Sequence, residues 1–293
     1  MKKKEILGLV FGFLIVGNVL AWKIVFDLNK PEFLEVNFFD IPGEAIFIQT
    51  PERNQILIDG GSDSKILEKL SKEIPFWDRE IELLILTHPE ADHLGGLLEV
   101  LKRYKVKNIL WTGIIKKGNE YEEWKKLIEK EGAKIEIAKA GKRVFCKNCQ
   151  WELKILFPLL SFEGIEFEDS NDTSVVAKLT FSNASFLFTG DLYQSGEEKI
   201  LKRNFPLKSE VLKVGHHGSK TSTSERFLEK VLPKLAIICV DKNNKYGHPH
   251  QEVIERLSKN GTKILRTDLN GDIKIISDGK TFKIKNQISK IKM

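Results

Sequence analysis

The stretch Thr87-His88-Pro89-Glu90-Ala91-Asp92-His93-Leu94-Gly95-Gly96 decides the fold, because of what lies on either side of it. The run 81–86 before it, apolar except for Glu82, is typical of a buried strand, and the spacing of apolar residues in 94–104 predicts a helix. A buried strand holds such a turn rigidly, so its side chains can converge on one point. His88, Glu90, Asp92 and His93 are all ligand types for zinc or manganese. The stretch therefore predicts a metal site at a strand end.

Two more segments place metal-binding residue types where an apolar strand stops. Thr189-Gly190-Asp191 closes the run 185–188, and Gly215-His216-His217-Gly218 closes the run 210–214. All six histidines of the chain lie in three short segments, the last being Tyr246-Gly247-His248-Pro249-His250 at the start of a predicted helix. Adjacent strand residues point in opposite directions, so of this pair His217 is expected to contact either metal or substrate.

The remaining pattern predicts two layered sheets with helices outside them. Strands are expected near 33–39, 45–48, 55–59, 81–86, 107–111, 210–214, 234–240, 262–266 and 272–276, with mainly strands in 134–188. Helices are expected at 63–73, 94–104, 120–130, 195–203, 223–231 and 250–259. No linker interrupts this pattern, which predicts one domain over residues 31–293 after a separate segment 1–30.

Taken together, these motifs are similar to those of a known protein family. The sequence resembles the metallo-β-lactamase superfamily of metallohydrolases, and within it the hydrolase domain of ComEC-type DNA-internalisation competence proteins. The likeness covers residues 35–278 and is carried by Leu57-Ile58-Asp59-Gly60-Gly61, His88-x-x-x-Asp92-His93, Asn171-Asp172-Thr173-Ser174, Thr189-Gly190-Asp191, His216-His217-Gly218-Ser219 and Tyr246-Gly-His-Pro-His250. It implies an α/β fold, a four-layer αββα sandwich with metal at one edge between the sheets.

The same resemblance implies roles for single residues. His88, Asp92 and His93 match metal ligands, Asp191 matches a carboxylate that bridges two metals, and His216 matches a late ligand. Asp59 matches a residue that orients the ligands.

Three departures from the family pattern bear on the metal. Glu90 stands where the family usually has a second histidine, and a hard oxygen ligand favours manganese or a single-metal site. The loop Asp40–Ala45 is shorter than the family's. The mid-chain histidine of the lactamases has no counterpart, and Asn171 or Asp172 is the nearest candidate. One or two ions of Zn²⁺ or Mn²⁺ are expected, and antibiotic hydrolysis is a poor hypothesis.

The expected chemistry is metal-assisted hydrolysis. Asp92 or Asp191 would orient the attacking water and accept its proton, and His217 or His248 would stabilise charge on the leaving oxygen. The resemblance favours a phosphodiesterase or nuclease acting on DNA outside the cytoplasmic membrane, with other DNA-uptake proteins as possible partners. The alternatives are a hydrolase of another envelope phosphodiester or small ester, and a metal-binding module without turnover.

The N-terminus predicts a membrane location. Residues 6–22 form 17 consecutive uncharged, mostly apolar positions, and the run resumes at 24–26. At ~1.5 Å per residue, 21 helical residues reach ~30 Å, enough to cross a bilayer. Lys2, Lys3 and Lys4 favour a cytoplasmic start and an extracytoplasmic domain. The alternative is a signal peptide cleaved after Val19-Leu20-Ala21, which would release a secreted protein.

Charge and cysteine content complete the picture. The net charge of +6 comes from the ends, since residues 1–5 carry +2 and residues 279–293 carry +5, so the body is almost neutral. The net charge of the whole chain therefore gives no argument for DNA binding. Three cysteines are too few for a disulfide framework, but Cys146 and Cys149 are spaced for a local disulfide, the alternative being two free thiols.

Overall fold

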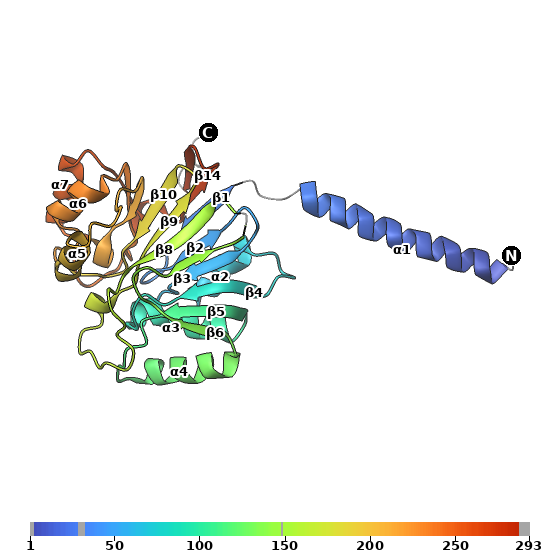
Figure 1. The fold of residues 1–293 in the computed structure, drawn as a ribbon, viewed down its shortest axis with the longest axis horizontal. Coiled ribbons are helices and arrows are strands. Elements are labelled where there is room, and N and C mark those ends of the chain that lie inside the picture. The colour runs from blue at the N-terminus through green and yellow to red at the C-terminus, as the bar shows by residue number, and fades with distance from the viewer. Residues whose placement is uncertain (1–2, 29–32, 148, 287–293) are drawn as a thin grey trace.

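The structure is a computed structural model that describes residues 3–28, 33–147 and 149–286. Two sheets stacked face to face form the centre of the molecule, and helices cover their outer faces (Figure 1). The predicted boundary between residues 30 and 31 lies outside the described residues, as do Lys2, Lys290 and Lys292.

The first sheet has eight strands, and three helices pack on its outer face. In spatial order its strands are β15 (Phe282–Asn286), β14 (Ile273–Ser277), β1 (Leu34–Phe38), β2 (Ile46–Gln49), β3 (Gln55–Ile58), β4 (Glu80–Ile85), β5 (Lys105–Trp111) and β6 (Lys134–Ile137). The three helices are α2 (Lys65–Glu73), α3 (Ala91–Leu101) and α4 (Asn119–Glu131). Successive side chains of a strand point to opposite faces of the sheet. Ile56 and Ile58 of β3 therefore face the second sheet, whereas Leu57 between them packs under the helices.

The second sheet has seven strands and a matching layer of helices. Its order is β13 (Lys263–Arg266), β12 (Leu235–Ile238), β11 (Val211–Lys213), β10 (Ala184–Phe188), β9 (Val176–Phe181), β8 (Trp151–Phe157) and β7 (Arg143–Phe145). Helices α5 (Gln194–Leu201), α6 (Glu225–Val231) and α7 (Gln251–Lys259) pack on its outer face. The short α8 (Thr267–Asn270) and the 3-10 turns η1 (Asn171–Thr173) and η2 (Gly215–Gly218) complete the elements.

Three hydrophobic cores correspond to the three spaces between four layers. One core lies between the sheets, one under α2 to α4 and one under α5 to α7. The predicted four-layer αββα arrangement is confirmed. The predicted elements occur within a few residues of their expected positions, and β15 is an added edge strand that pairs with β14.

Helix α1 (Lys3–Leu28) stands apart from the sandwich (Figure 1). Its segment Lys3–Lys23 is long and apolar enough to cross a membrane, and none of it is buried against the rest of the protein. The single predicted apolar helix is therefore present, as a candidate membrane span by length and composition.

The two cysteines at the β7–β8 hairpin are paired. Cys146 and Cys149 form a disulfide with their Cα atoms 5.3 Å apart, and Cys239 is a free, buried thiol. Of the two alternatives for this pair, the structure has the disulfide.

Candidate metal centre

The candidate site lies where strands of both sheets end. Asp59 follows β3, His88 and His93 follow β4, Asp191 follows β10, and His217 follows β11. Close backbone packing fixes this edge: a Cβ added to Gly96 in α3 would lie 1.9 Å from the carbonyl oxygen of Gly60, so α3 approaches the β3 loop only because both residues are glycines. The sequence thus brings segments from the whole chain to one edge.

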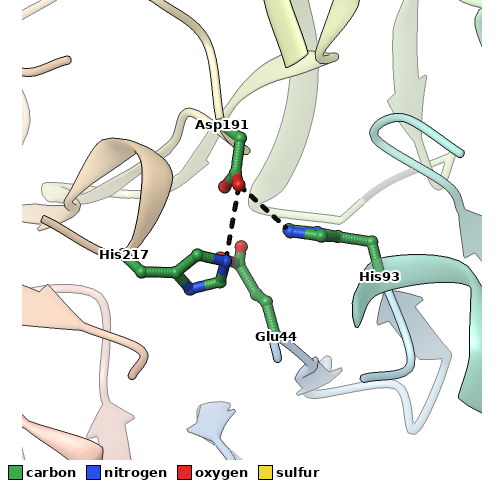
Figure 2. Close-up of side chains that lie close together, drawn as sticks. All are labelled: Glu44, His93, Asp191 and His217. Atoms are coloured by element: carbon green, nitrogen blue, oxygen red, sulfur yellow. Dashed lines mark ion pairs between the residues drawn. The ribbon is translucent and has the colours of Figure 1, made fainter. Parts of the chain in front are cut away.

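Asp191 is the centre of this cluster. Its Oδ2 lies 3.3 Å from Nε2 of His93 and 3.4 Å from Nε2 of His217, and Figure 2 shows these two rings directed at the carboxylate. His216 and His88 are slightly farther, with Nε2 at 3.9 and 4.0 Å. Asp92 Oδ2 lies 3.2 Å from Nε2 of His217. Four imidazole nitrogens and two carboxylates therefore face one small volume.

The polar atoms in this volume are of the kind that a cation satisfies. Nε2 of His88, His93 and His217 and Oε1 of Glu44 are buried without a hydrogen-bond partner among the described residues. Buried polar atoms without partners are costly and rare in folded proteins. Ligand atoms of Glu44, His93, Asp191 and His217 all lie within 4.8 Å of one another (Figure 2). Nitrogen and carboxylate donors suit zinc or manganese, so the residues present fit a divalent metal.

The Nδ1 atoms of two histidines in the cluster are held by neighbouring acceptors. Nδ1 of His93 lies 2.7 Å from Oδ2 of Asp59, and Nδ1 of His217 lies 2.7 Å from the carbonyl oxygen of Cys239. Asp59 also accepts hydrogen bonds from the amide and hydroxyl of Thr87. An acceptor at Nδ1 keeps a proton on that nitrogen and directs Nε2 into the site, which is how proteins orient metal-binding histidines.

The charges of the cluster oppose the effect of burial on the pKa values of its residues. Burial by itself would lower the pKa of His217, but Asp191 and Asp92 outweigh it and raise that pKa to about 10. His93 behaves in the same way, with its pKa raised by Asp191, Asp59 and Asp92. Burial would raise the pKa of Asp191, yet His217, His93 and Lys213 hold it well below its ordinary value. The Asp191 carboxylate therefore stays ionised.

Sequence reasoning missed two residues, Glu44 and Lys213. Both side chains are buried and form an ion pair, and Lys213 Nζ lies 3.5 Å from Oδ1 of Asp191 and donates to the Gly190 carbonyl oxygen at 2.9 Å. The negative charges around this ammonium raise its pKa despite burial. Glu44 belongs to the shortened loop 40–45. The signal for Lys213 was a single charge inside the otherwise apolar strand 211–214.

Both histidines of η2 reach the site, contrary to the expectation of opposite directions. His216 and His217 have φ values of 48° and 51°, so the chain forms a left-handed turn here rather than extended strand. His217, rather than His216, belongs to the group with Glu44, His93 and Asp191. His216 instead lies with Nδ1 3.2 Å from the Thr221 hydroxyl.

Other predicted residues lie at the margin. The Glu90 carboxylate contacts Lys116 and Ser170, and it is outside the group of converging ligand atoms. The His248 ring lies 5.4 Å from that of His216 and 6.5 Å from that of His217, beside the site.

At the mid-chain position, neither Asn171 nor Asp172 reaches the cluster. Asn171 donates to Tyr193, and Asp172 contacts Ser195 and Lys199. The hydroxyl of Ser174 lies 3.2 Å from Nδ1 of His88 and accepts from the Asp191 amide, so Ser174 is the mid-chain residue at the site.

The chain is similar to curated proteins whose names refer to the ComE operon, recombination and competence. It is 36% identical over 261 residues to ComE operon protein 3 of Bacillus subtilis, covering 82% of this chain and 32% of that protein. It is 30% identical over 279 residues to Recombination protein 2 of Haemophilus influenzae, covering 92% of this chain and 32% of that one. Competence protein ComA of Neisseria gonorrhoeae is 32% identical over 204 residues, 66% of this chain and 25% of that protein. The chain thus spans about a third or less of these relatives.

Solved structures support the fold. The metallo-beta-lactamase fold protein YhfI of Bacillus subtilis superposes with a TM-score of 0.51 at 13% identity, covering 80% of this chain and 95% of that one. The E377D mutant of CmlA beta-hydroxylase gives 0.53 at 13% identity, covering 82% of this chain and 53% of that one. The family model described as the metallo-beta-lactamase superfamily matches residues 40–241. With this match across most of the domain, the chain belongs to the metallo-beta-lactamase superfamily.

Proposed function

We propose that this protein is a metal-dependent phosphodiesterase that hydrolyses DNA outside the cytoplasmic membrane. The observation that carries the proposal is the convergence of unpartnered His88, His93 and His217 nitrogens with the Asp191 carboxylate. The similarity to competence and recombination proteins supports DNA as the substrate.

The residues that would hold the metal are His93, Asp191 and His217, with His88, Asp92 and Glu44 beside them. A divalent cation bound there supplies Lewis acidity and lowers the pKa of a water molecule toward ~7. Of the carboxylates, Asp92 is the partly exposed one, whereas Asp191 and Glu44 are buried. Asp92 is therefore positioned to orient water from the solvent side and to accept its proton.

His248 is the proposed contact to the leaving oxygen. Burial, together with the neighbouring histidines, lowers the pKa of His248 to about 4, so the ring is neutral at pH 7 and presents an N–H donor. The His248 ring lies beside the rings of His216 and His217. A neutral donor at the rim of the metal cluster stabilises developing negative charge. Glu90 and His216 stay predicted ligands from the sequence, whereas the geometry supports His217 as a ligand with Glu44 beside it.

The proposed location rests on the N-terminal segment. We propose that residues 1–30 anchor the protein and that residues 31–293 form the hydrolase domain on the extracytoplasmic side, where incoming DNA and other DNA-uptake proteins would be met. Support comes from the apolar segment Lys3–Lys23 and the lysines that precede it.

The test compares wild type with Asp191→Ala and with Asp172→Ala as the matched control. Asp172 is a carboxylate nearby that contacts Ser195 and Lys199 instead of the cluster. Each purified full chain is assayed with zinc, manganese or magnesium on linear single- and double-stranded DNA and on bis-p-nitrophenyl phosphate. Hydrolysis by wild type and Asp172→Ala, with loss in Asp191→Ala, supports the proposal.

The other outcomes contradict it in separate ways. Hydrolysis of the small ester without DNA hydrolysis indicates the envelope phosphodiester or small-ester alternative. No hydrolysis with any metal indicates a binding module, and equal rates in wild type and Asp191→Ala indicate a contaminating enzyme.

A further inference from the structure

Two aromatic side chains stand exposed at the tip of the loop between α2 and β4. Phe76 is 79% exposed and Trp77 is 72% exposed. Their rings contact each other edge to face, with centroids 4.9 Å apart. Two adjacent large aromatic side chains facing solvent mark an interaction surface far more often than an isolated exposed residue does.

The loop that carries this pair is held in place by hydrogen bonds. The Asp78 amide donates to the Pro75 carbonyl oxygen at 2.9 Å, which closes a turn around the two aromatic residues. The Asp78 carboxylate accepts from the Gln55 side chain at 2.7 Å and from the Glu80 amide at 3.1 Å. The pair is therefore presented outward by a fixed turn.

Sheet topology shows at which end of the sandwich the pair lies. Strand β1 is antiparallel to β2, β2 is antiparallel to β3, and β3 is parallel to β4, so β1 and β4 start at the same end of the first sheet. The chain enters β1 from α1, and Phe76 and Trp77 immediately precede β4. We call this end the anchor end, defined by Phe33, the loop 75–78 and the turn 278–281. The metal cluster follows the opposite ends of β3 and β4.

The anchor end is close enough to α1 to meet the same bilayer. Six residue steps separate Leu28 from Leu34, which limits the distance between them to ~20 Å. The loop 75–78 lies three strand spacings from β1, or ~14 Å across the sheet. Figure 1 shows the loop between α2 and β4 on the side of the sandwich from which the chain runs to α1.

We infer that Phe76 and Trp77 insert into the interfacial layer of the bilayer that α1 crosses, so that the anchor end rests on the membrane and the metal cluster faces away from it. The inference rests on the proposed membrane span. Trp and Phe suit this layer because their rings are large and apolar and the indole N–H can meet a headgroup. Phe33, 43% exposed at the same end, adds to this surface.

Quenching of tryptophan fluorescence tests the contact. The full chain is reconstituted in phosphatidylcholine vesicles whose acyl chains are brominated near the carbonyl group or near the bilayer centre. Trp22 in α1 and Trp77 are exposed, whereas Trp111, Trp124 and Trp151 are buried in the domain, so variants with and without Trp77 differ by the quenching of Trp77 alone. In Trp22→Phe, shallow bromines should quench more strongly than deep ones. Adding Trp77→Phe should remove that quenching.

Each result decides between the anchor and the loop contact. Quenching in Trp22→Phe equal to that in the Trp22→Phe/Trp77→Phe double variant overturns the inference. If Trp22 is quenched in Trp77→Phe but Trp77 is not quenched in Trp22→Phe, α1 spans the membrane and the loop does not contact it. Loss of both signals rejects the membrane span as well. Protection of Trp77 from aqueous iodide without quenching by bromine also overturns the inference and indicates a second copy of the chain as the partner.

Discussion

Oδ2 of Asp59 lies 2.7 Å from Nδ1 of His93, and both side chains are fully buried. Asp59 is in turn held by the Thr87 amide at 2.8 Å and the Thr87 hydroxyl at 2.6 Å. This chain of hydrogen bonds fixes both the rotation of the His93 ring and the nitrogen that faces the cluster. Affinity for metal should therefore depend on a residue that does not touch the metal.

Asp59→Asn should weaken metal binding while leaving the fold intact. The amide can still accept from Thr87, but it no longer offers His93 a charged acceptor, and loss of such a partner typically costs ~10–100-fold in metal affinity. Competition with a chromophoric chelator measures the change. Asp63→Asn is the control, because the Asp63 carboxylate contacts Lys65 at the exposed start of α2. Equal affinities for Asp59→Asn and wild type would contradict the proposed orienting role.

Lys213→Met should strongly destabilise the metal-free protein. The substitution removes the ammonium that pairs with the buried Glu44 carboxylate and lies beside Asp191, and removal of one partner from a buried pair costs ~3–5 kcal/mol. Urea unfolding with chelator present measures this loss. Lys234→Met, which breaks the exposed pair with Glu210, should cost less than ~1 kcal/mol. A similar small loss at Lys213 would show that its charge is not needed there.

Metal should raise the melting temperature of the wild-type protein. A ligand at 100 times its Kd stabilises the native state by ~2.7 kcal/mol. For a domain of this size, each kcal/mol shifts Tm by ~2–4 °C, so a rise of several degrees is expected. Asp191→Ala should abolish the rise because Asp191 is central to the cluster, and Asp172→Ala should retain it. Differential scanning calorimetry with and without zinc or manganese decides the matter, and an equal rise in Asp191→Ala would place the metal elsewhere.

Glu197→Ala should disturb the turn that carries His216 and His217. The buried Glu197 carboxylate accepts from the Thr223 and Ser224 amides, and the Thr223 hydroxyl accepts from the Gly215 amide at the start of that turn. Leaving these amides without an acceptor costs ~1–3 kcal/mol. The adjacent Glu198→Ala, which breaks a surface pair with Arg226, should have little effect on stability or metal affinity. Equal stability of the two variants would show that Glu197 does not support the turn.

Binding of DNA should depend on the lysines of the C-terminal hairpin. Lys280, Lys283 and Lys285 are exposed on a molecule whose body is nearly neutral. Because β15 pairs with β14, substitution by glutamine is a cleaner test than truncation, which would remove an edge strand. The triple variant should bind DNA more weakly, with a smaller dependence of affinity on salt. Its hydrolysis of bis-p-nitrophenyl phosphate should stay unchanged, and an unchanged salt dependence would contradict the role of these lysines.

Much of the fold was readable from local patterns. The apolar run 81–86 with its motif, the alternation in 55–59 and the helical spacing in 120–130 each predicted an element that the structure contains. Periodicity succeeds here because each element buries one face or stripe, and that requirement is written into neighbouring residues. The pairing of β15 with β14 was harder to foresee, since an edge strand contributes few buried positions.

The sequence by itself determined the layered α/β class, the apolar N-terminal helix and the residue types that gather at strand ends. Only the tertiary structure decided which of those residues meet. It turned Glu90 toward Lys116, brought in Glu44 from a short loop, and placed the Lys213 ammonium between two carboxylates. It also gave His216 and His217 left-handed backbone, so that neighbours in sequence both reach Asp191. The reason is physical: periodicity reports burial of one face, whereas convergence depends on turns and contacts between segments distant in sequence.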